Sequence, residues 1–356
     1  MTERKDILSL TYDQLETALV SELGQKKFRA GQIFTWLHEK KTDSFSQMTN
    51  IPADLRQKLE ESFYIGKLEI ARKLESKSDA TVKYLFRLSD GNIVESVVMD
   101  YSFGLSICVS TQIGCKMGCD FCASAIAGFV RNLTSSEILL QKYTAERDLG
   151  KRISRVVLMG IGEPLDNYEN VLNFIDIVSH EKGDNLGQRH ITLSTCGIVP
   201  RIYDLAEKDL SINLAVSLHS PSDEERSRIM PVNRRYGLSE LIPACRSYIS
   251  KTGRRITFEY AVIAGVNSSD EDAKKLASLL KGMICHVNLI AVNNVKERSY
   301  SSTVKHVERF RKELERLGVN ATIRRKLGSD IDAACGQLRR EFEESRGECI
   351  ESSHSD

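Results

Sequence analysis

The first 65 residues carry apolar side chains at spacings of three and four positions, the period of a helix with one buried face. A proline, Pro52, stands near the start of the last such stretch, where a helix accepts it. We therefore expect a small helical accessory domain over residues 1–67, with helices at 11–20, 29–38 and 55–63.

The pattern then changes from helical spacing to runs rich in β-branched and aromatic residues. Two such runs, at 81–88 and 92–99, flank the turn Ser89-Asp-Gly. Asp followed by Gly favours a tight turn between strands. We expect a β-hairpin linker over residues 68–101 that bridges two larger parts of the chain.

From about residue 105 onward, short β-rich runs alternate with helical stretches. Such alternation predicts an α/β fold with a parallel sheet and crossover helices, either doubly wound or closed into a partial or complete barrel. In both architectures, chemistry gathers at the carboxyl ends of the strands. The expected strands are 105–111, 153–160, 190–196, 212–219, 255–263, 286–293 and 322–326, and the expected helices include 135–150, 171–180, 269–282 and 304–317.

The composition is that of an ordinary soluble protein. Of the 356 residues, 41% are hydrophobic and 28% are charged, which argues against a disordered or coiled-coil chain. No apolar run approaches the roughly 18 residues of a membrane span, and the N-terminus lacks the apolar stretch of a signal peptide. We expect a cytoplasmic protein.

Charge is uneven along the chain. Residues 341–356 hold six acidic side chains against one arginine, and we expect residues 339–356 to form a disordered acidic tail. Residues 102–338 are the expected α/β core. Because the net charge of the whole chain is +1, the body is mildly basic, which is compatible with a nucleic-acid partner but is equally explained by solvated surface charge.

Nine cysteines in a chain of this kind indicate metal or thiol chemistry rather than a disulfide scaffold. Cys115, Cys119 and Cys122 form a Cys-x3-Cys-x2-Cys run directly after the first expected strand of the core. Three thiolates on one loop can bind three irons of a cubane iron–sulfur cluster and leave the fourth iron open. Structural zinc needs four ligands, so a zinc site and chance clustering of buried thiols are weaker interpretations.

An iron with an open coordination position at the end of such a sheet resembles the radical S-adenosylmethionine (SAM) superfamily. Its Cys-x3-Cys-x-aromatic-Cys loop is matched by Cys115, Cys119, Phe121 and Cys122. The resemblance implies a partial (βα)6 barrel and a [4Fe–4S] cluster whose fourth iron binds the methionyl amine and carboxylate of S-adenosylmethionine. It also implies that electron transfer splits the sulfonium into a 5′-deoxyadenosyl radical.

Polar and small residues follow the later strands. Gly162 and Glu163 lie in Gly160-Ile-Gly-Glu-Pro, where small residues allow close backbone approach and the carboxylate could accept hydrogen bonds from an ammonium group. A tight helix-entry turn would explain the same residues. Ser194, Ser217 and His219 end the third and fourth strands, where each could instead be an ordinary satisfied polar residue.

Residues 95–338 closely resemble the RlmN class of dual-specificity RNA adenine C2 methyltransferases, and the N-terminal helices fit that family's accessory domain less distinctively. The family's targets are an adenosine in the peptidyl-transferase region of 23S rRNA and the adenosine 3′ of the anticodon in some tRNAs. The matching segments are Phe121-Cys-Ala-Ser, Gly128-Phe-Val-Arg-Asn-Leu, Met159-Gly-Ile-Gly-Glu-Pro-Leu, Gln188-Arg-His-Ile-Thr-Leu-Ser-Thr, Ser217-Leu-His-Ser and Asp330-Ile-Asp-Ala-Ala-Cys-Gly-Gln-Leu.

The resemblance implies how C2 is methylated. Adenine C2 is electron-poor and its C–H bond is not acidic, so a methyl sulfonium cannot simply alkylate it. One S-adenosylmethionine methylates the thiol of Cys335, and a second supplies the radical that takes a hydrogen from this methyl group, whose carbon then adds to C2. Cys108 matches the resolving thiol, which frees the RNA by forming a disulfide with Cys335. Glu95 matches the residue for substrate positioning or proton acceptance, although an exposed strand carboxylate is the ordinary alternative.

The same match assigns the remaining contacts. The electron donor expected for the family is a flavodoxin-type reductase, and a monomer is the default. We expect Cys196, Cys245 and Cys285 to be small core residues. The implied contacts to S-adenosylmethionine are Gly162, Glu163, Ser194, Ser217, Leu218, His219 and Asn293, with Asn294 as the alternative to the last, and the candidate RNA contacts are Arg131, Arg189, Arg234, Arg235, Arg324, Arg325 and Lys326.

Three alternatives stay open at this point. The Cfr branch shares the cluster and both thiols but methylates C8 of the same adenosine, and it typically has Ala where this chain has Pro164. A non-catalytic iron–sulfur RNA-binding sensor would need neither Cys335 nor Cys108. A zinc-stabilised RNA chaperone would contain zinc in place of iron.

Overall fold

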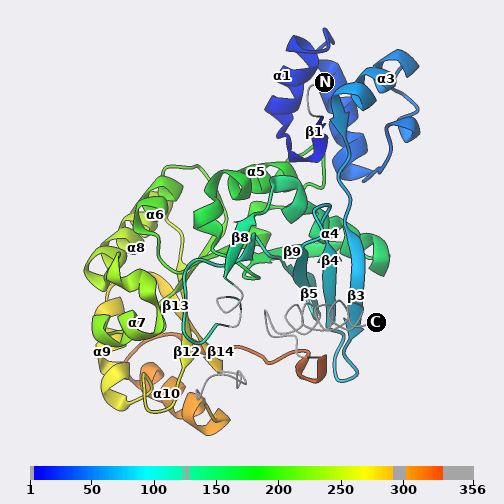
Figure 1. Ribbon diagram of the computed structural model, residues 1–356. Helices are drawn as coiled ribbons and strands as arrows, with labels where there is room; N and C mark the ends of the chain where they lie inside the picture. The colour runs from blue at the N-terminus through cyan, green and yellow to red at the C-terminus, as the bar shows by residue number, and fades with distance from the viewer. Residues whose placement is uncertain (1–3, 123, 125–127, 292–301, 332–356) are drawn as a thin grey trace, which may run out of the picture.

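The computed structural model describes residues 4–122, 124, 128–291 and 302–331 (Figure 1). Its centre is one sheet of ten strands in the order β14-β13-β12-β11-β10-β9-β6-β5-β4-β3. From β6 to β14 all neighbouring strands are parallel. Helices return the chain between them, so the predicted α/β barrel of six βα units is confirmed. Within the described residues no pairing joins β14 to β3, which leaves the barrel partial.

The barrel elements follow one another as strand and helix. The parallel strands are β6 (Gly104–Cys108), β9 (Ile153–Leu158), β10 (Ile191–Thr195), β11 (Asn213–Ser217), β12 (Ile256–Val262), β13 (Cys285–Ala291) and β14 (Ala321–Ile323). The helices are α4 (Ser135–Leu149), α5 (Tyr168–Ser179), α6 (Val199–Ala206), α7 (Asp223–Ile229), α8 (Leu238–Thr252), α9 (Asp270–Leu280) and α10 (Val304–Arg316).

Each predicted barrel strand has a counterpart, but several predictions run a few residues too far at the carboxyl end. The prediction over 190–196 corresponds to β10, which ends at Thr195, and the prediction over 212–219 corresponds to β11, which ends at Ser217. Cys196 and His219 lie just beyond these ends and are buried. The apolar pattern therefore continues past the strands, because the residues that follow them are buried around a pocket.

The expected hairpin is part of a larger arrangement. β4 (Val82–Arg87) and β5 (Ile93–Tyr101) pair antiparallel as predicted, but β3 (Glu69–Glu75) adds a third strand and β5 pairs with β6. The segment therefore extends the barrel sheet instead of bridging two separate bodies. β3 carries charged side chains at several positions and lies at the edge of the sheet, which is typical of edge strands and hides its apolar pattern.

The N-terminal region folds as helices that stand beside one end of the sheet (Figure 1). Its elements are β1 (Lys5–Asp6), α1 (Tyr12–Ser21), α2 (Phe28–Phe34), a π-helical turn at Thr35–Glu39, α3 (Ala53–Ser62) and β2 (Phe63–Tyr64). Buried contacts join this region to α4 and the loop after α5. The hydroxyl of Tyr143 lies 3.3 Å from Nδ1 of His38, and Lys41 forms an ion pair with Asp184 at 3.0 Å.

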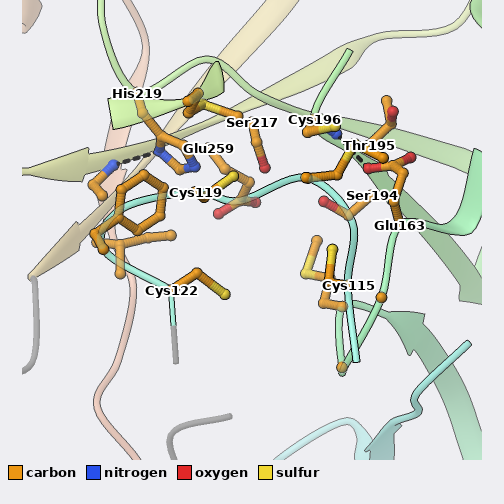
Figure 2. Close-up of a pocket in the computed structure, with 18 of the residues that line it drawn as sticks. Cys115, Cys119, Cys122, Glu163, Ser194, Thr195, Cys196, Ser217, His219 and Glu259 are labelled. Atoms are coloured by element: carbon orange, nitrogen blue, oxygen red, sulfur yellow. Dashed lines mark hydrogen bonds between the residues drawn. The ribbon is translucent and has the colours of Figure 1, made fainter. Parts of the chain in front are cut away.

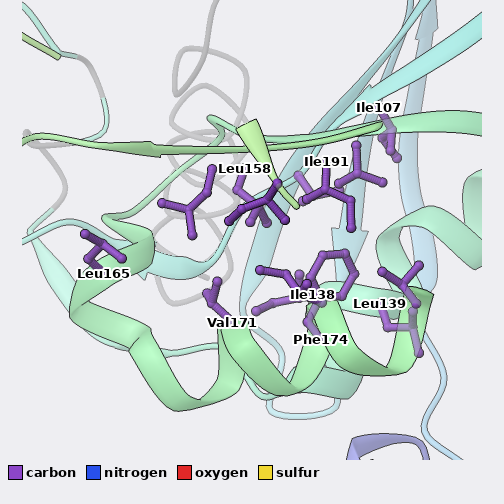
Figure 3. Packing of buried hydrophobic residues seen from close by; sticks show 14 of the residues in the cluster. Ile107, Ile138, Leu139, Leu158, Leu165, Val171, Phe174 and Ile191 are labelled. Carbon is purple, nitrogen blue, oxygen red and sulfur yellow. The ribbon is translucent and has the colours of Figure 1, made fainter. Parts of the chain in front are cut away.

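The core beneath the sheet is apolar. Figure 3 shows Ile138 and Leu139 of α4 and Phe174 of α5 packed below Leu158 and Ile191 of the adjacent strands. Burying each such side chain contributes about 1.5–3 kcal/mol, so these helices hold β9 and β10 in fixed positions. No helix among the described residues is long and apolar enough to cross a membrane.

Candidate functional site

A pocket of about 330 Å³ opens at the carboxyl ends of the central parallel strands (Figure 2). The cysteine loop after β6 forms one wall. The loop after β9 and the ends of β10, β11 and β12 form the others. The predicted residues that line this pocket are Cys115, Cys119, Phe121, Cys122, Gly162, Glu163, Ser194, Ser217 and His219.

The cysteine loop is held at its base by a short hairpin, β7 (Gln112–Gly114) with β8 (Phe129–Asn132). The amide of Cys115 donates a 3.0 Å hydrogen bond to the carbonyl of Gly128. A Cβ atom on Gly114, whose φ is +76°, would lie 1.6 Å from that carbonyl oxygen. Only glycine permits this approach, so the backbone closes tightly just before the first thiol.

The three thiols lie along one wall of the pocket and do not meet at one point. In the described part of the chain, no group of three or more His, Cys, Asp or Glu residues converges on a single metal ion. A cubane cluster bonds each thiolate to a different iron, so its ligands must be spread around it. Burial raises the pKa of Cys115 to about 12 and raises that of Cys119 further. The thiolate form therefore needs cations beside it, which the irons of a cluster provide.

Glu163 is buried in the wall that the loop after β9 forms. Its carboxylate accepts hydrogen bonds from the amide of Leu165 at 3.0 Å and from the amide of Cys196 at 2.7 Å. Burial raises its pKa, and the hydrogen bond from Cys196 opposes that rise. The carboxylate caps the 3-10 helix Pro164–Asn167, so the helix-entry turn that the sequence offered as an alternative is present. Because each carboxylate oxygen has a second lone pair, the cap leaves acceptors available to a ligand.

Gly162 presses against Gln112, a buried residue that the sequence analysis did not single out. The side-chain oxygen of Gln112 accepts a 2.8 Å hydrogen bond from the amide of Glu163. Its side-chain nitrogen donates to Asn132 and Asp166, each at 2.8 Å. Gln112 therefore connects the hairpin that carries the cysteine loop to the loop that carries Glu163.

We expect Gly162→Ala to disable the pocket. The glycine has a φ of +108°, and an added Cβ would lie 2.6 Å from Cβ of Gln112. We expect a loss of about 1–3 kcal/mol of stability from backbone strain and at least a tenfold weaker affinity for S-adenosylmethionine. The measurements are thermal unfolding and equilibrium binding.

Gly150→Ala is the matched control for Gly162→Ala. Gly150 ends α4 with a φ of +61°, and a Cβ there would meet no atom within 4 Å. The control should lose stability without losing affinity. Equal affinities in the two variants would contradict the role given to Gly162.

The ends of β10 and β11 supply polar groups from a third side. Ser194 and Ser217 are half-buried and line the pocket. His219 has a φ of +57°, which is rare for a residue with a side chain. Its Nδ1 accepts a 2.9 Å hydrogen bond from the amide of Ala261, and burial lowers its pKa to about 3. The ring of His219 is therefore neutral, and it meets Phe121 of the cysteine loop edge to face at 4.8 Å.

Among the described residues, the predicted site residues that do not line the pocket are Leu218, Cys108 and Glu95. Leu218 is buried in the main core cluster, and its amide donates to the carbonyl of Glu259 at 3.0 Å. Asn293, with its alternative Asn294, and Cys335 lie outside the described residues. The structure therefore brings together most of the expected contacts and leaves Leu218 with its backbone near the site.

Cys108 and Glu95 lie on neighbouring strands, β6 and β5. Cys108 is buried in a small cluster with Val97 and Met99, against which Leu327 packs from the segment that leads toward Cys335. Glu95 is 3% exposed, so the alternative of an exposed strand carboxylate is wrong. Its carboxylate lies 3.4 Å from the ammonium of Lys83, which is also buried.

The candidate RNA contacts divide into two groups. Arg234, Arg235, Arg325 and Lys326 are exposed, and Arg324 lines the pocket. The guanidinium of Arg131 is instead held by Glu137 through two 2.8 Å hydrogen bonds and by Asp90. Arg189 precedes β10 and therefore lies at the end of the sheet opposite to the pocket. Sequence position alone did not distinguish Arg131 and Arg189 from arginines near the opening of the pocket.

Glu259 is a further residue that the sequence analysis missed. It lies on β12, is 5% exposed and lines the pocket near Ser217 and Cys119 (Figure 2). Asn288 donates hydrogen bonds of 3.2 and 3.0 Å to its two oxygens. Burial raises its pKa, and the charge of Arg324 opposes that rise. Glu259 is the only charged residue in a largely apolar strand, and this is the only signal of its role in the sequence.

Comparison with known families agrees with this geometry. The family description "Ribosomal RNA large subunit methyltransferase N-terminal domain" matches residues 5–65, and "Radical SAM superfamily" matches residues 109–278. The second match contains the three thiols and most of the pocket. The first covers the N-terminal helices.

Relatives and one solved structure match over almost the whole chain. The probable dual-specificity RNA methyltransferase RlmN of Clostridium perfringens strain SM101 is 54% identical over 344 residues, which are 96% of this chain and 99% of the relative. That of Clostridium botulinum strain Eklund 17B is 55% identical over 348 residues, which are 97% and 100% of the two chains. The crystal structure of a radical SAM methyltransferase from Sphaerobacter thermophilus superposes with a TM-score of 0.87 at 42% identity, covering 94% of this chain and 98% of that one.

Proposed function

We propose that this chain, which belongs to the RlmN family of radical SAM dual-specificity RNA methyltransferases, methylates C2 of adenosine in 23S rRNA and in tRNA. The observation that carries the proposal is the shared pocket. Three thiols of one loop, the buried carboxylate of Glu163 and the serines that end two strands all line it. These are the groups that an iron–sulfur cluster and S-adenosylmethionine require.

Each wall of the pocket has a part in holding the cofactors. Cys115, Cys119 and Cys122 would bind three irons of the [4Fe–4S] cluster. Glu163 would accept hydrogen bonds from the methionyl ammonium group, while Ser194 and Ser217 would bind the remaining polar atoms of S-adenosylmethionine. When bound, the cluster and S-adenosylmethionine supply the radical that removes a hydrogen atom from a methyl group.

The two thiols outside the cluster carry the methyl transfer. Cys335 takes a methyl group from one S-adenosylmethionine. After the radical derived from a second S-adenosylmethionine has removed a hydrogen atom from this methyl group, the remaining S–CH2 carbon bonds to C2. The adduct then loses the C2 proton and passes one electron to the oxidised form of the one-electron donor. Cys108 attacks the sulfur of Cys335, the S–CH2 bond breaks, and its electron pair takes a proton to complete the product methyl group.

Counting the electrons that the reaction needs indicates two redox partners. The electron that splits the sulfonium comes from a low-potential, one-electron donor of the flavodoxin type, and the disulfide between Cys108 and Cys335 is reset by an external dithiol. Two molecules of S-adenosylmethionine are consumed for each product. With 23S rRNA and tRNA as its substrates, the enzyme would act in the cytoplasm. The N-terminal helices would serve as an RNA-binding accessory domain.

The segment before Cys335 is anchored by Asp330. Its carboxylate accepts hydrogen bonds from the amide of Lys77 at 2.8 Å and from the hydroxyls of Ser76 at 2.7 Å and Ser78 at 3.0 Å, all in the turn between β3 and β4. The hydroxyl of Ser76 and these other donors lower its pKa to about 2. The anchor is therefore complete above the ordinary value of 3.8 and is lost only as the pH falls through about 2.

We expect Asp330→Ala to slow methylation about tenfold, because Cys335 then searches a wider range of positions. The affinity for S-adenosylmethionine should stay unchanged. The ratio of the variant's methylation rate to that of the wild type should be the same at every pH above 3.8, the ordinary pKa of the carboxyl group. Asp270→Ala is the control, since Asp270 pairs with Arg309 at another surface. A full rate in Asp330→Ala would show that the anchor does not position Cys335.

The function is tested with reconstituted enzyme and RNA that lacks the modification. After incubation with S-adenosylmethionine and a low-potential reductant, nucleosides are separated and identified by mass spectrometry. We expect 2-methyladenosine from both 23S rRNA and tRNA. The appearance of 8-methyladenosine would move the chain to the Cfr-type reaction, and the absence of either product would favour a non-catalytic role.

A further inference from the structure

Arg226 is a wholly buried guanidinium beside the pocket, and none of the expected motifs includes it. It lies on α7 and is 0% exposed. Its Nε donates to the carbonyl of Leu218 at 3.0 Å, and its Nη2 donates to the carbonyls of Cys196 at 2.7 Å and Ser217 at 3.1 Å. These carbonyls follow or end two neighbouring strands, so one side chain cross-links the ends of β10 and β11.

Asn233 fixes the orientation of this guanidinium. Its side-chain oxygen accepts a 2.7 Å hydrogen bond from Nη1 of Arg226. Its side-chain nitrogen donates to the carboxylate of Asp223 at 2.9 Å and to the hydroxyl of Ser227 at 2.8 Å. Because the amide nitrogen is directed to these acceptors, the oxygen must face Arg226.

The same helix supports the cysteine loop. The carbonyl of Ile229, the last residue of α7, accepts a 2.9 Å hydrogen bond from the amide of Asp120. Asp120 lies between Cys119 and Phe121 in the cysteine loop. Ile229 and Met230 form a buried cluster against which Cys119 and Phe121 pack. α7 therefore holds both the strand ends and the loop that would carry the cluster.

The charge of Arg226 is not matched by a nearby carboxylate. In the described residues its guanidinium takes part in no ion pair, and Asp223 acts on it only at longer range. The carboxylate of Asp223 is used by Asn233 and by the amide of Leu238 at 2.8 Å. A buried cation without an anion is costly. Cys119 packs against the buried cluster at the end of the helix that carries Arg226.

We propose that Arg226 is a positioning residue of the SAM pocket whose guanidinium fixes the ends of β10 and β11 and whose charge stabilises the reduced, more negative form of the cluster. The proposal rests on the proposed function. Cys196 and Ser217, whose carbonyls it holds, line the pocket beside Ser194 and His219 (Figure 2). A shift of these strand ends would separate the polar groups that contact S-adenosylmethionine. Because the guanidinium is buried, water screens its field weakly at the cluster.

Two variants separate the geometric role from the charge. Arg226→Lys keeps the charge but cannot reach three carbonyls and Asn233 together. Arg226→Met removes both. Arg254→Met is the matched control, because Arg254 donates to the carbonyl of Ile212 at 2.7 Å and to Asn213 at 3.0 Å at the opposite end of β11.

The readouts are the affinity for S-adenosylmethionine, the fraction of reduced cluster at a fixed solution potential measured by electron paramagnetic resonance, and thermal unfolding. Iron analysis of the wild-type protein comes first. If the wild type binds no cluster, the proposed function fails and the part of the proposal that concerns charge fails with it, while the affinity of the variants for S-adenosylmethionine still decides the positioning role.

We expect Arg226→Met to bind S-adenosylmethionine at least tenfold more weakly and to lower the ratio of reduced to oxidised cluster about tenfold, which corresponds to about 59 mV for one electron. Arg226→Lys should bind S-adenosylmethionine as weakly as Arg226→Met does, but its ratio of reduced to oxidised cluster should stay within about threefold of the wild type. Arg254→Met should lower only the unfolding temperature.

Three results would overturn the proposal. Equal affinity and equal reduced fraction in Arg226→Met and Arg254→Met would leave Arg226 with a merely structural role. Weakened affinity with an unchanged reduced fraction in Arg226→Met would refute the part of the proposal that concerns charge. If Arg226→Met does not fold, Arg226→Lys decides the positioning role, and wild-type affinity in that variant would refute it.

Discussion

Replacement of Cys335 by alanine should reduce the formation of 2-methyladenosine to background, at least about a thousandfold below the wild type, because no other thiol would carry the methyl group. Cluster content and the affinity for S-adenosylmethionine should stay unchanged, since the described groups that line the pocket come from other parts of the chain. The measurement is nucleoside mass spectrometry of the RNA after incubation with the reconstituted variant.

Cys285→Ala is the matched control for Cys335→Ala. Cys285 begins β13 and is half-buried, at the end of the sheet remote from the pocket. This variant should methylate RNA at the wild-type rate. Full methylation by Cys335→Ala would contradict the methyl-carrier role and would show that the Cys335 thiol takes no part in the reaction.

Replacement of Cys108 by alanine should stop the reaction one step later. RNA would remain bonded to Cys335 because no thiol attacks its sulfur. We expect little free 2-methyladenosine and a protein–RNA adduct that survives denaturation, seen as a slowly migrating band on a denaturing gel. The burial of Cys108 beside Leu327 supports this role, since Leu327 lies in the segment that leads to Cys335.

The control for the adduct is the double variant of Cys108 and Cys335. It should form no adduct, because the carrier thiol is absent. An adduct in the double variant would place the bond on another residue. Normal turnover by Cys108→Ala would mean that a different group releases the RNA.

Local patterns in the sequence predicted the barrel strands and the loop that carries the thiols. Cys115, Cys119 and Cys122 are close in sequence, so their spacing alone indicated a shared site. Glu163 follows a strand in a short motif, and the structure confirms that it faces the same pocket. These features depend on residues a few positions apart, which is what sequence patterns report.

The features that were missed depend on contacts between distant segments. Gln112 reaches Glu163 from the hairpin of β7 and β8. In the sequence Arg226 resembles any helix arginine, and only the structure shows its burial against two strand ends. Arg131 resembled a surface cation but is held by Glu137. β3 was overlooked because its charged side chains mask an edge strand. Burial and ion pairing of single side chains are set by the tertiary fold, so the sequence alone did not reveal them.

The most direct test of the central claim uses S-adenosylmethionine with a trideuterated methyl group. The reconstituted enzyme is incubated with this substrate, reductant and unmodified RNA, and the mass of the methylated adenosine is measured. If a hydrogen atom is removed from a methyl group on Cys335 before the bond to C2 forms, 2-methyladenosine retains two deuterium atoms and the third appears in 5′-deoxyadenosine. Retention of all three deuterium atoms would show direct transfer of an intact methyl group and would contradict the account.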